Sequence, residues 1–375
     1  MDEAQAPSYR RLALLPYLLL FAFFAVGALI SEQQARSEQQ AVGNGVSERP
    51  AAVGSEVPVM MILGGLVMAI MIGTRFRVGG DWETYTLYWD FAADSTLAEM
   101  LEFGDPAYQF LNWLGQQLKL DIWSVNLVCG AVFTWGLIRF ARTQPLPWLV
   151  LVVAIPYLVM VVAMGYTRQA VAIGLLLGGL ASLFRGGSLV RFAVYIVLAA
   201  LFHKTAVLAL PLIIFLRRSN RLLSVLGGLL LLYGLYVALL ADNIDQLVTN
   251  YIDARYQSSG AVIRVGLSLL PAVLFLNAPS RFAFDDLQRG FFRLSSWATI
   301  GLLVALLTTP SSTAVDRMAL YMFPLQLAVM SRLPIAYPGF GTRLVVVCYA
   351  LTIQLVWLNF ADFAFKWLPY RTYLL

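Results

Sequence analysis

Charged and metal-binding residues are scarce in this sequence. Of its 375 residues, 13% are charged and 60% are hydrophobic, whereas a soluble domain carries about 25% and about 45 to 50%. A soluble protein is therefore excluded. Both cysteines, Cys129 and Cys348, lie inside apolar runs, so we expect neither a disulfide framework nor a cysteine metal site.

Other binding classes are excluded by what is missing. The chain has one histidine, His203, which excludes a histidine-rich metal site. Its formal net charge of +5 is modest and it has no basic tract, so nucleic acid is not an expected partner. We expect no metal and no other cofactor.

Apolar runs of membrane-spanning length recur along the chain. A helix needs about 20 apolar residues to cross a hydrocarbon core of about 30 Å, so we predict an all-α polytopic membrane protein with about 11 to 12 transmembrane helices. We expect one integral membrane domain over residues 1–375. The predicted spans are 12–30, 57–73, 122–140, 146–164, 167–184, 189–202, 205–216, 222–241, 262–277, 291–308, 316–330 and 344–360.

The stretch 189–216 decides the orientation of the bundle. It could cross once as a tilted helix, or a break at His203-Lys204 could divide it into two short helices. With the break, one face holds Arg139, Arg142, Arg185, Arg191, Arg217, Arg218, Arg221, Arg281, Arg289, Arg293, Arg332 and Arg343. The other face of the same region holds Arg168, Lys204, Arg255, Arg264 and Arg317. The positive-inside rule then makes the first face cytoplasmic and puts both termini outside, although Arg10 and Arg11 favour a cytoplasmic N-terminus.

Two loops follow the first two spans. Residues 31–56 are rich in Glu, Gln and Ser, a composition typical of a flexible connector. Residues 74–121 form a long loop, predicted to be periplasmic, in which aromatic residues are spread among acids. That mixture favours amphipathic helices lying on the outer leaflet.

Ionisable side chains collect at the outer ends of the predicted spans. Such groups cost about 2.5 to 3.5 kcal/mol within a membrane-inserted helix, so they are candidates for function. Most of the cations among them are arginines, which bind phosphate through a planar fork of donors. The candidates are Arg75, Arg77, Asp81, Arg168, Gln169, His203, Lys204, Arg255, Tyr256, Asp316 and Arg317. They predict one outward-open cavity that binds phosphate.

Each cluster also has a structural interpretation. The segment from Arg75 to Asp81 contains Gly79-Gly80 and could be a turn with a local ion pair. His203 could be a buried hydrogen-bond donor, and Asp316 could complement a helix dipole. Behind Arg168, the small residues Ala170, Gly174 and Gly178 recur at every fourth position and predict close packing against a neighbouring helix.

In order along the chain, these motifs make the sequence resemble the EpsG family of bacterial exopolysaccharide polymerases, relatives in role of the Wzy O-antigen polymerases. The resemblance extends over about two thirds of the chain. It rests on Arg75 to Tyr85, Thr167-Arg168-Gln169, Phe202-His203-Lys204-Thr205-Ala206 and Arg317 to Tyr321.

The resemblance implies a GT-C-like membrane enzyme of the bacterial inner membrane. Its substrates would be oligosaccharide repeat units on undecaprenyl diphosphate, joined at the periplasmic face, and a chain-length regulator is a candidate partner beside membrane lipid. A diphosphate leaving group needs fixed cations, which arginines can supply without a metal. We therefore expect a metal-independent reaction, and our hypothesis is direct displacement with inversion. The expected diphosphate ligands are Arg75, Arg77, Arg168, Arg317, Lys204 and Arg255, and the expected sugar ligands are Trp82, Tyr85, Gln169, Tyr256 and Tyr321.

Two residues are candidates for the general base that takes the proton of the acceptor hydroxyl. Asp81 lies on a turn near arginines, which should lower its pKa and weaken it as a base. His203 has the better ordinary pKa, near neutrality. Both stay candidates at this stage.

Other functions fit the same residues. A lipid-linked oligosaccharide transporter would also need arginines for the diphosphate, although it often shows inverted repeats, and none is visible. A glycosyltransferase that uses a polyprenyl monophosphate sugar could use Asp81 with a divalent metal, and a ligase would share the chemistry of a polymerase.

Overall fold

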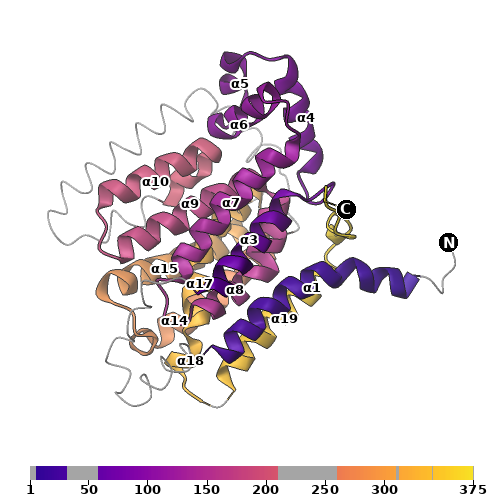
Figure 1. Ribbon diagram of the computed structural model, residues 1–375. Helices are drawn as coiled ribbons and strands as arrows, with labels where there is room; N and C mark the ends of the chain where they lie inside the picture. Colours follow the sequence, from indigo (N-terminus) through magenta and orange to yellow (C-terminus); the bar gives the residue numbers. More distant parts are fainter. Residues whose placement is uncertain (1–5, 32–57, 210–259, 310–311, 340, 375) are drawn as a thin grey trace.

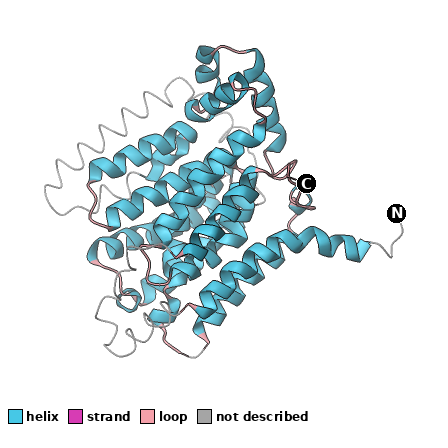
Figure 2. Cartoon of the chain, in the orientation of Figure 1, coloured by secondary structure: helices cyan, strands magenta, loops and turns pink. Residues whose placement is uncertain are grey.

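The computed structural model describes residues 6–31, 58–209, 260–309, 312–339 and 341–374. Regular structure within these ranges is helical, apart from an isolated antiparallel bridge between Arg75 and Thr372. Helices packed side by side make up the body of the molecule (Figure 2). The predicted all-α fold is confirmed for the described residues.

Helices packed side by side form the bundle, some of them divided into shorter pieces, and further elements connect them at its ends (Figure 1). The bundle contains α1 (Ala6–Ile30), α3 (Val59–Gly73), α7 (Ile122–Ala141), α8 (Pro147–Ala154), η1 (Ile155–Ala163), α9 (Thr167–Phe184), α10 (Leu189–Phe202), α14 (Ala261–Asn277), α15 (Asp286–Thr308), α16 (Thr313–Ala319), η6 (Leu320–Met322), α17 (Phe323–Ser331) and α19 (Thr342–Phe360). The shorter elements are α4 (Trp82–Asp94), α5 (Leu97–Phe103), α6 (Pro106–Gln117), η2 (Lys204–Ala209), η5 (Pro279–Phe282), α18 (Leu333–Ala336) and η7 (Ala364–Lys366).

Several bundle helices can cross a membrane. Among the described residues, five are long and apolar enough: residues Ala13–Ile30 of α1, and α7, α9, α15 and α19. The apolar helices α3, α8 with η1, α10 and α14 are shorter. The chain is therefore a multi-pass membrane protein. The predicted span 222–241 and most of the span 205–216 lie outside the described residues, so the total number of spans stays a prediction.

Helix α9 packs closely against α7 because glycines remove side chains from the contact. A Cβ at Gly174 would lie 2.5 Å from Phe133 Cα, and one at Gly136 would lie 1.9 Å from the Gly174 carbonyl oxygen. Nearly all of α9 is buried. The close packing predicted from the small-residue stripe is confirmed at Gly174.

Two of the predicted spans change their helical form. The span 146–164 is α-helical up to Ala154 and π-helical from Ile155 to Ala163. Pro156 at the start of this π-helix has no backbone N–H to continue the α-helical pattern. The span 316–330 is divided into α16, η6 and α17, with Pro324 near the start of α17.

The predicted break at His203 is confirmed. Helix α10 ends at Phe202, His203 is extended (φ −156°, ψ 110°), and the 3-10 helix η2 begins at Lys204. The backbone N–H of His203 still bonds the Ala199 carbonyl oxygen at 2.9 Å. His203 therefore lies at a helix end, which is where a side chain can be presented to a cavity.

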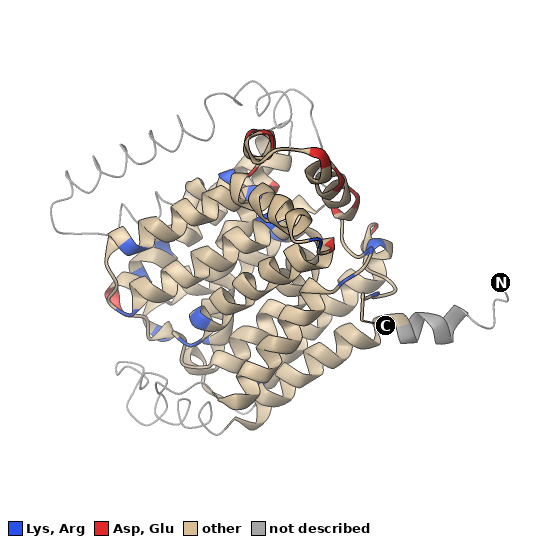
Figure 3. Ribbon diagram, turned by 45° about the horizontal axis from the view of Figure 1, so that its top comes forward, with Lys and Arg blue, Asp and Glu red and all other residues tan. Residues whose placement is uncertain are grey.

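Helices α4, α5 and α6 lie together at one end of the bundle, as expected for the loop 74–121 (Figure 1). Thr96 and Glu99 begin α5 with a reciprocal capping box. Much of the red that marks Asp and Glu in Figure 3 lies on this group of helices. Contact between these helices and the outer leaflet stays a prediction.

Arginines mark the opposite end of the bundle. Arg343, at the start of α19, donates to the Ala28 and Leu29 carbonyl oxygens at the end of α1. Arg185 donates to the Arg142 carbonyl oxygen at 3.3 Å. Arg185 and Arg343, which are predicted from the sequence to lie on the same face, therefore both bond backbone carbonyl groups at helix ends.

The C-terminal segment returns to the segment that follows α3. Phe76 N–H donates to the Arg371 carbonyl oxygen at 2.9 Å, and Tyr373 N–H donates to the Thr74 carbonyl oxygen at 2.8 Å. Trp367 is buried, and its Nε1 donates to the Met160 carbonyl oxygen at 2.8 Å. The segment before Asp81 is therefore fixed by residues nearly 300 positions later in the sequence.

Candidate functional site

A cavity of about 190 Å³, here called the arginine cavity, opens at the end of the bundle that bears α4 to α6. It lies where α4 and α9 begin, where α10 ends, and along α16. Seven residues expected from the sequence line it: Asp81, Tyr85, Arg168, Gln169, His203, Asp316 and Arg317. Tyr166, Arg264, Thr313 and Leu320 complete its lining.

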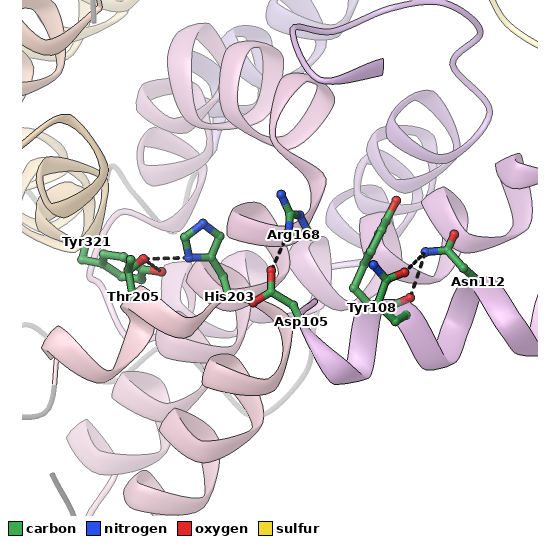
Figure 4. A network of polar contacts seen from close by, with 8 residues as sticks. Asp105, Tyr108, Asn112, Arg168, His203, Thr205 and Tyr321 are labelled. Carbon is green, nitrogen blue, oxygen red and sulfur yellow. Dashed lines mark hydrogen bonds and ion pairs between the residues drawn. The ribbon is translucent and has the colours of Figure 1, made fainter. Parts of the chain in front are cut away.

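Arg168 is fixed in this cavity by a carboxylate from the loop helices. Its Nη1 donates to Asp105 Oδ2 at 2.8 Å (Figure 4). Its guanidinium also lies 6.0 Å from the ring centre of Tyr85 and 5.3 Å from that of Tyr88. A backbone hydrogen bond from Lys204 also reaches the Asp105 carboxylate. Asp105 therefore joins the start of α6 to the start of α9 and to the break after α10.

Arg264 is a second fixed arginine. It forms an ion pair with Asp316, and its Nε donates to the Tyr157 hydroxyl at 2.9 Å. Its Nη2 donates to the Tyr166 hydroxyl at 3.2 Å. Tyr157 belongs to the π-helix η1, and its hydroxyl reaches Arg264 on α14. These bonds engage the whole fork of Arg264, so it shapes the cavity wall and adds positive charge.

His203 belongs to a chain of hydroxyl contacts. Its Nδ1 lies 2.7 Å from Thr205 Oγ1, which lies 3.1 Å from the Tyr321 hydroxyl (Figure 4). If Nδ1 carries the proton and donates a hydrogen bond to Thr205 Oγ1, Nε2 keeps a lone pair that can accept a proton from a substrate. Thr205 is thus positioned to set the tautomer that a histidine base needs.

Asp81 is held by its backbone at the start of α4. Its N–H donates to the Gly165 carbonyl oxygen at 3.2 Å. The neighbouring Gly79 has φ +114°, and a Cβ there would lie 2.2 Å from the Met164 carbonyl oxygen, so this tight approach requires glycine. The glycine pair expected to allow close approach therefore does so at Gly79.

The expected lowering of the Asp81 pKa is wrong. Burial raises the pKa of Asp81 from its usual value of 3.8, although Arg168, Arg317 and Lys366 act to lower it. The sequence analysis weighed only the nearby arginines, whereas removing a carboxylate from water favours its neutral form. A raised pKa makes Asp81 a better proton acceptor once it is ionised.

Other expected ligands lie outside the lining of the arginine cavity. Arg75 is fully buried and bonds Ile72, Asn126 and Thr167, which ties α3 to α7 and α9. This placement argues against contact between Arg75 and a substrate. Arg77 is exposed, with φ 52°, over the ring of Phe76.

Three further expected residues also lie apart from this lining. Trp82 is 8% exposed and packs edge-on against Phe76. Lys204 is half-buried beside Asp105. The Tyr321 hydroxyl contacts Thr205, which in turn contacts His203 in the lining of the cavity. Arg255 and Tyr256 lie outside the described residues.

Sequence reasoning missed Asp105, Tyr166 and Arg264 as members of the site. A signal existed for Asp105, because Asp-Pro begins helix α6 at its N-cap and first position. Arg264 falls near the start of an apolar span, where a charge is a functional candidate. Tyr166 directly precedes the Thr-Arg-Gln motif, and only its contacts identify it.

The described residues show no group of three or more His, Cys, Asp or Glu side chains that could hold a metal ion. The lining of the arginine cavity includes three arginines, two aspartates and one histidine. Such a set of donors suits an anion better than a metal cation.

These features define a multi-pass membrane protein with an arginine-lined cavity at one end of its helical bundle. The model of the EpsG family matches residues 59–372. The chain belongs to the EpsG family, the family of exopolysaccharide polymerases related in role to Wzy. No curated protein and no solved structure matches it.

Proposed function

We propose that this protein is a glycosyltransferase that joins undecaprenyl-diphosphate-linked oligosaccharide repeat units into exopolysaccharide or O-antigen at the periplasmic face of the inner membrane. The observation that supports this most directly is the arginine cavity, where Arg168 and Arg317 lie with the two candidate bases, Asp81 and His203. Membership of a polymerase family supports the reaction class.

The arginine cavity suits a diphosphate leaving group. Arginine has five N–H donors, and the ion pair with Asp105 holds Arg168 in one orientation through Nη1. Arg317 lies on α16, whose backbone is tied to α9 because Gln169 Nε2 donates to the Arg317 carbonyl oxygen at 3.0 Å. Fixed cations of this kind stabilise the negative charge that develops as a diphosphate leaves.

The proposed step is a direct displacement with inversion. The acceptor hydroxyl oxygen attacks the anomeric carbon of the donor sugar, and the new carbon–oxygen bond forms as the bond to the diphosphate breaks. The diphosphate lipid leaves with the bonding electron pair, and the hydroxyl proton passes to the base. We favour Asp81 as this base because burial raises its pKa toward the range of a useful proton acceptor.

A transporter of lipid-linked oligosaccharide is the competing function. The outward position predicted for the cavity favours an enzyme, since a transport site must be reachable from both faces. A transferase that uses a polyprenyl monophosphate sugar would need one phosphate site and a metal-assisted base.

One experiment separates these functions. The purified protein is incubated in detergent with lipid-diphosphate repeat unit, with EDTA present, and the lipid-linked products are separated by gel or mass analysis. We expect a ladder of lengthening glycans in the presence of the chelator. Activity that needs added metal would favour the monophosphate transferase, and movement of lipid across vesicles without a ladder would favour the transporter.

Variants test the diphosphate site in the same assay. Arg168→Ala and Arg317→Ala should each lower the rate by about 10²- to 10³-fold, as when a donor to a developing anion is removed. Arg77→Ala is the matched control, because Arg77 is exposed and outside the cavity. Normal polymer from both cavity variants, inserted in the membrane as wild type, would contradict a diphosphate site there.

A further inference from the structure

A second cavity lies behind the wall formed by Arg264 and Tyr166. It has a volume of about 290 Å³ and is lined mainly by aromatic side chains, so we call it the aromatic cavity. Arg264 and Tyr166 line both cavities. The two spaces are therefore neighbours that share one fixed wall.

The buried part of the aromatic cavity is formed by aromatic rings that pack together. Trp357 and Trp367 meet edge to face, with ring centres 4.8 Å apart. Both are buried, at 8% and 1% exposed. Tyr157 joins them from the π-helical turn and bonds Arg264. Pre-arranged aromatic faces of this kind bind flat apolar surfaces with little loss of conformational entropy.

The rim of the aromatic cavity is exposed and includes a carboxylate. Phe360 and Phe363 are 80% and 52% exposed, and the carboxylate of Asp362 lies between them in the sequence. Aromatic faces pack against the C–H faces of sugar rings, while a carboxylate accepts hydrogen bonds from sugar hydroxyls. An apolar lining with a few placed polar groups is typical of a ligand site.

We propose that the aromatic cavity binds the non-reducing terminal sugars of the acceptor glycan. This inference rests on the proposed function, because a polymerase needs a second glycan beside the donor. The acceptor hydroxyl would reach past Tyr166 to Asp81, whose backbone N–H bonds Gly165, the residue before Tyr166. Trp367, which lines the aromatic cavity, also lies near Asp81, since a Cβ at the adjacent Gly80 would lie 3.5 Å from its ring.

An interfacial aromatic belt is the alternative explanation of these side chains. Burial of Trp357 and Trp367 argues against it, because belt residues face the lipid headgroups. Phe365 provides a matched control. It is 66% exposed in the same C-terminal segment and does not line the cavity.

The test uses the repeat-unit oligosaccharide released from its lipid diphosphate by mild acid. This free glycan has an acceptor hydroxyl but no leaving group, so it can act only as an acceptor. Its binding to the detergent-purified protein is measured by saturation-transfer NMR. We expect Phe363→Ala and Asp362→Asn each to weaken binding about tenfold, with Phe365→Ala equal to wild type. Both rim residues are exposed, so these changes should leave folding intact.

Turnover gives the second readout. With lipid-linked donor in excess, the rim variants should raise the KM for free glycan about tenfold and change kcat less than twofold. Wild-type protein that does not bind the free glycan, or rim variants that match Phe365→Ala in both measurements, would overturn the inference. Wild-type protein that binds the glycan but extends neither it nor the lipid-linked unit would overturn the proposed function and leave the glycan site standing.

Discussion

Asp105 is the residue on which the geometry around Arg168 depends. The two side chains are 9% and 20% exposed, and their atoms are 2.8 Å apart. When one partner of a buried pair is removed, the other charge is left without compensation, which costs about 3 to 5 kcal/mol. The same carboxylate also contacts the backbone after the α10 break.

We predict that Asp105→Asn lowers the thermal stability of the purified protein and slows polymer formation by at least tenfold. Asp105→Glu should recover part of the rate because the charge returns. Asp286→Asn is the control, since Asp286 pairs with Arg289 at 3.2 Å but is fully exposed, and surface pairs contribute little. Equal behaviour of the Asp105 and Asp286 variants would contradict the positioning role.

The raised pKa of Asp81 predicts a pH dependence. The ionised form is the base, so activity should be lost as pH falls through the pKa of Asp81, which lies above 3.8. Lys366 lowers this pKa and lies outside the arginine cavity, with its Nζ 3.4 Å from the Gly80 carbonyl oxygen. Lys366→Met should therefore move the acid limb of the rate profile to higher pH and leave the plateau rate within about twofold.

The rate of chain extension measured from pH 4 to pH 9 checks this prediction. Arg168, Arg317 and Arg264 also act on Asp81, and they stay unchanged in the Lys366 variant. An acid limb that does not move in Lys366→Met, but is altered by Thr205→Val, would transfer the role of base to His203.

At the scale of elements, two glycines test how α9 is held. A Cβ at Gly174 would lie 2.5 Å from the backbone of α7, whereas one at Gly266 in α14 meets nothing within 4 Å. We expect Gly174→Ala to destabilise the protein by about 1 to 3 kcal/mol, because the backbone of α7 must shift. Gly266→Ala should be neutral or stabilise by up to about 1 kcal/mol, through helix propensity.

Thermal unfolding in detergent measures both glycine variants. Because α9 begins with the Thr-Arg-Gln motif, Gly174→Ala should also lower the activity more than Gly266→Ala does. Similar melting temperatures for the two variants would refute the close packing of α7 with α9.

The C-terminal segment acts at the same scale. It has an exposed aromatic rim, yet its backbone bonds the segment around Phe76, and Trp367 packs below Gly165. In this way one short segment supports the turn that bears Asp81 and also lines the aromatic cavity. No motif in the sequence indicated that role.

At the scale of the whole molecule, the charge asymmetry predicts which end faces outward. Asp94 at the end of α4 and Asp286 at the start of α15 are both exposed and belong to opposite ends of the bundle. In a protein with Cys129 and Cys348 replaced by Ser, we expect Asp94→Cys to react with a membrane-impermeant maleimide in intact spheroplasts. Asp286→Cys should react only after the membrane is permeabilised. The reverse pattern would place the arginine cavity in the cytoplasm.

Much of the helical layout was predictable from hydropathy. The described parts of the predicted spans are helical apart from Pro58 and Leu146 at the start of two of them, and α9 begins and ends where it was expected. Hydropathy is a local property that a window of sequence contains. The break at His203 was predicted, because two polar residues interrupt an apolar run there. The π-helix after Ala154 was not predicted, although Pro156 lies at its start.

The sequence by itself determined the class of the protein and predicted the chemistry of its site. Composition required a membrane, and arginines at span ends indicated an anion, because both follow from the cost of placing charge in lipid. The tertiary structure decided which of those charges share a cavity. Arg75 and Arg168 both lie near the outer end of a predicted span in the sequence. In the structure Arg75 is fully buried and joins helices, whereas Arg168 lines the arginine cavity. Contacts between segments far apart in the chain, such as Arg168 with Asp105 and Arg264 with Asp316, made that difference.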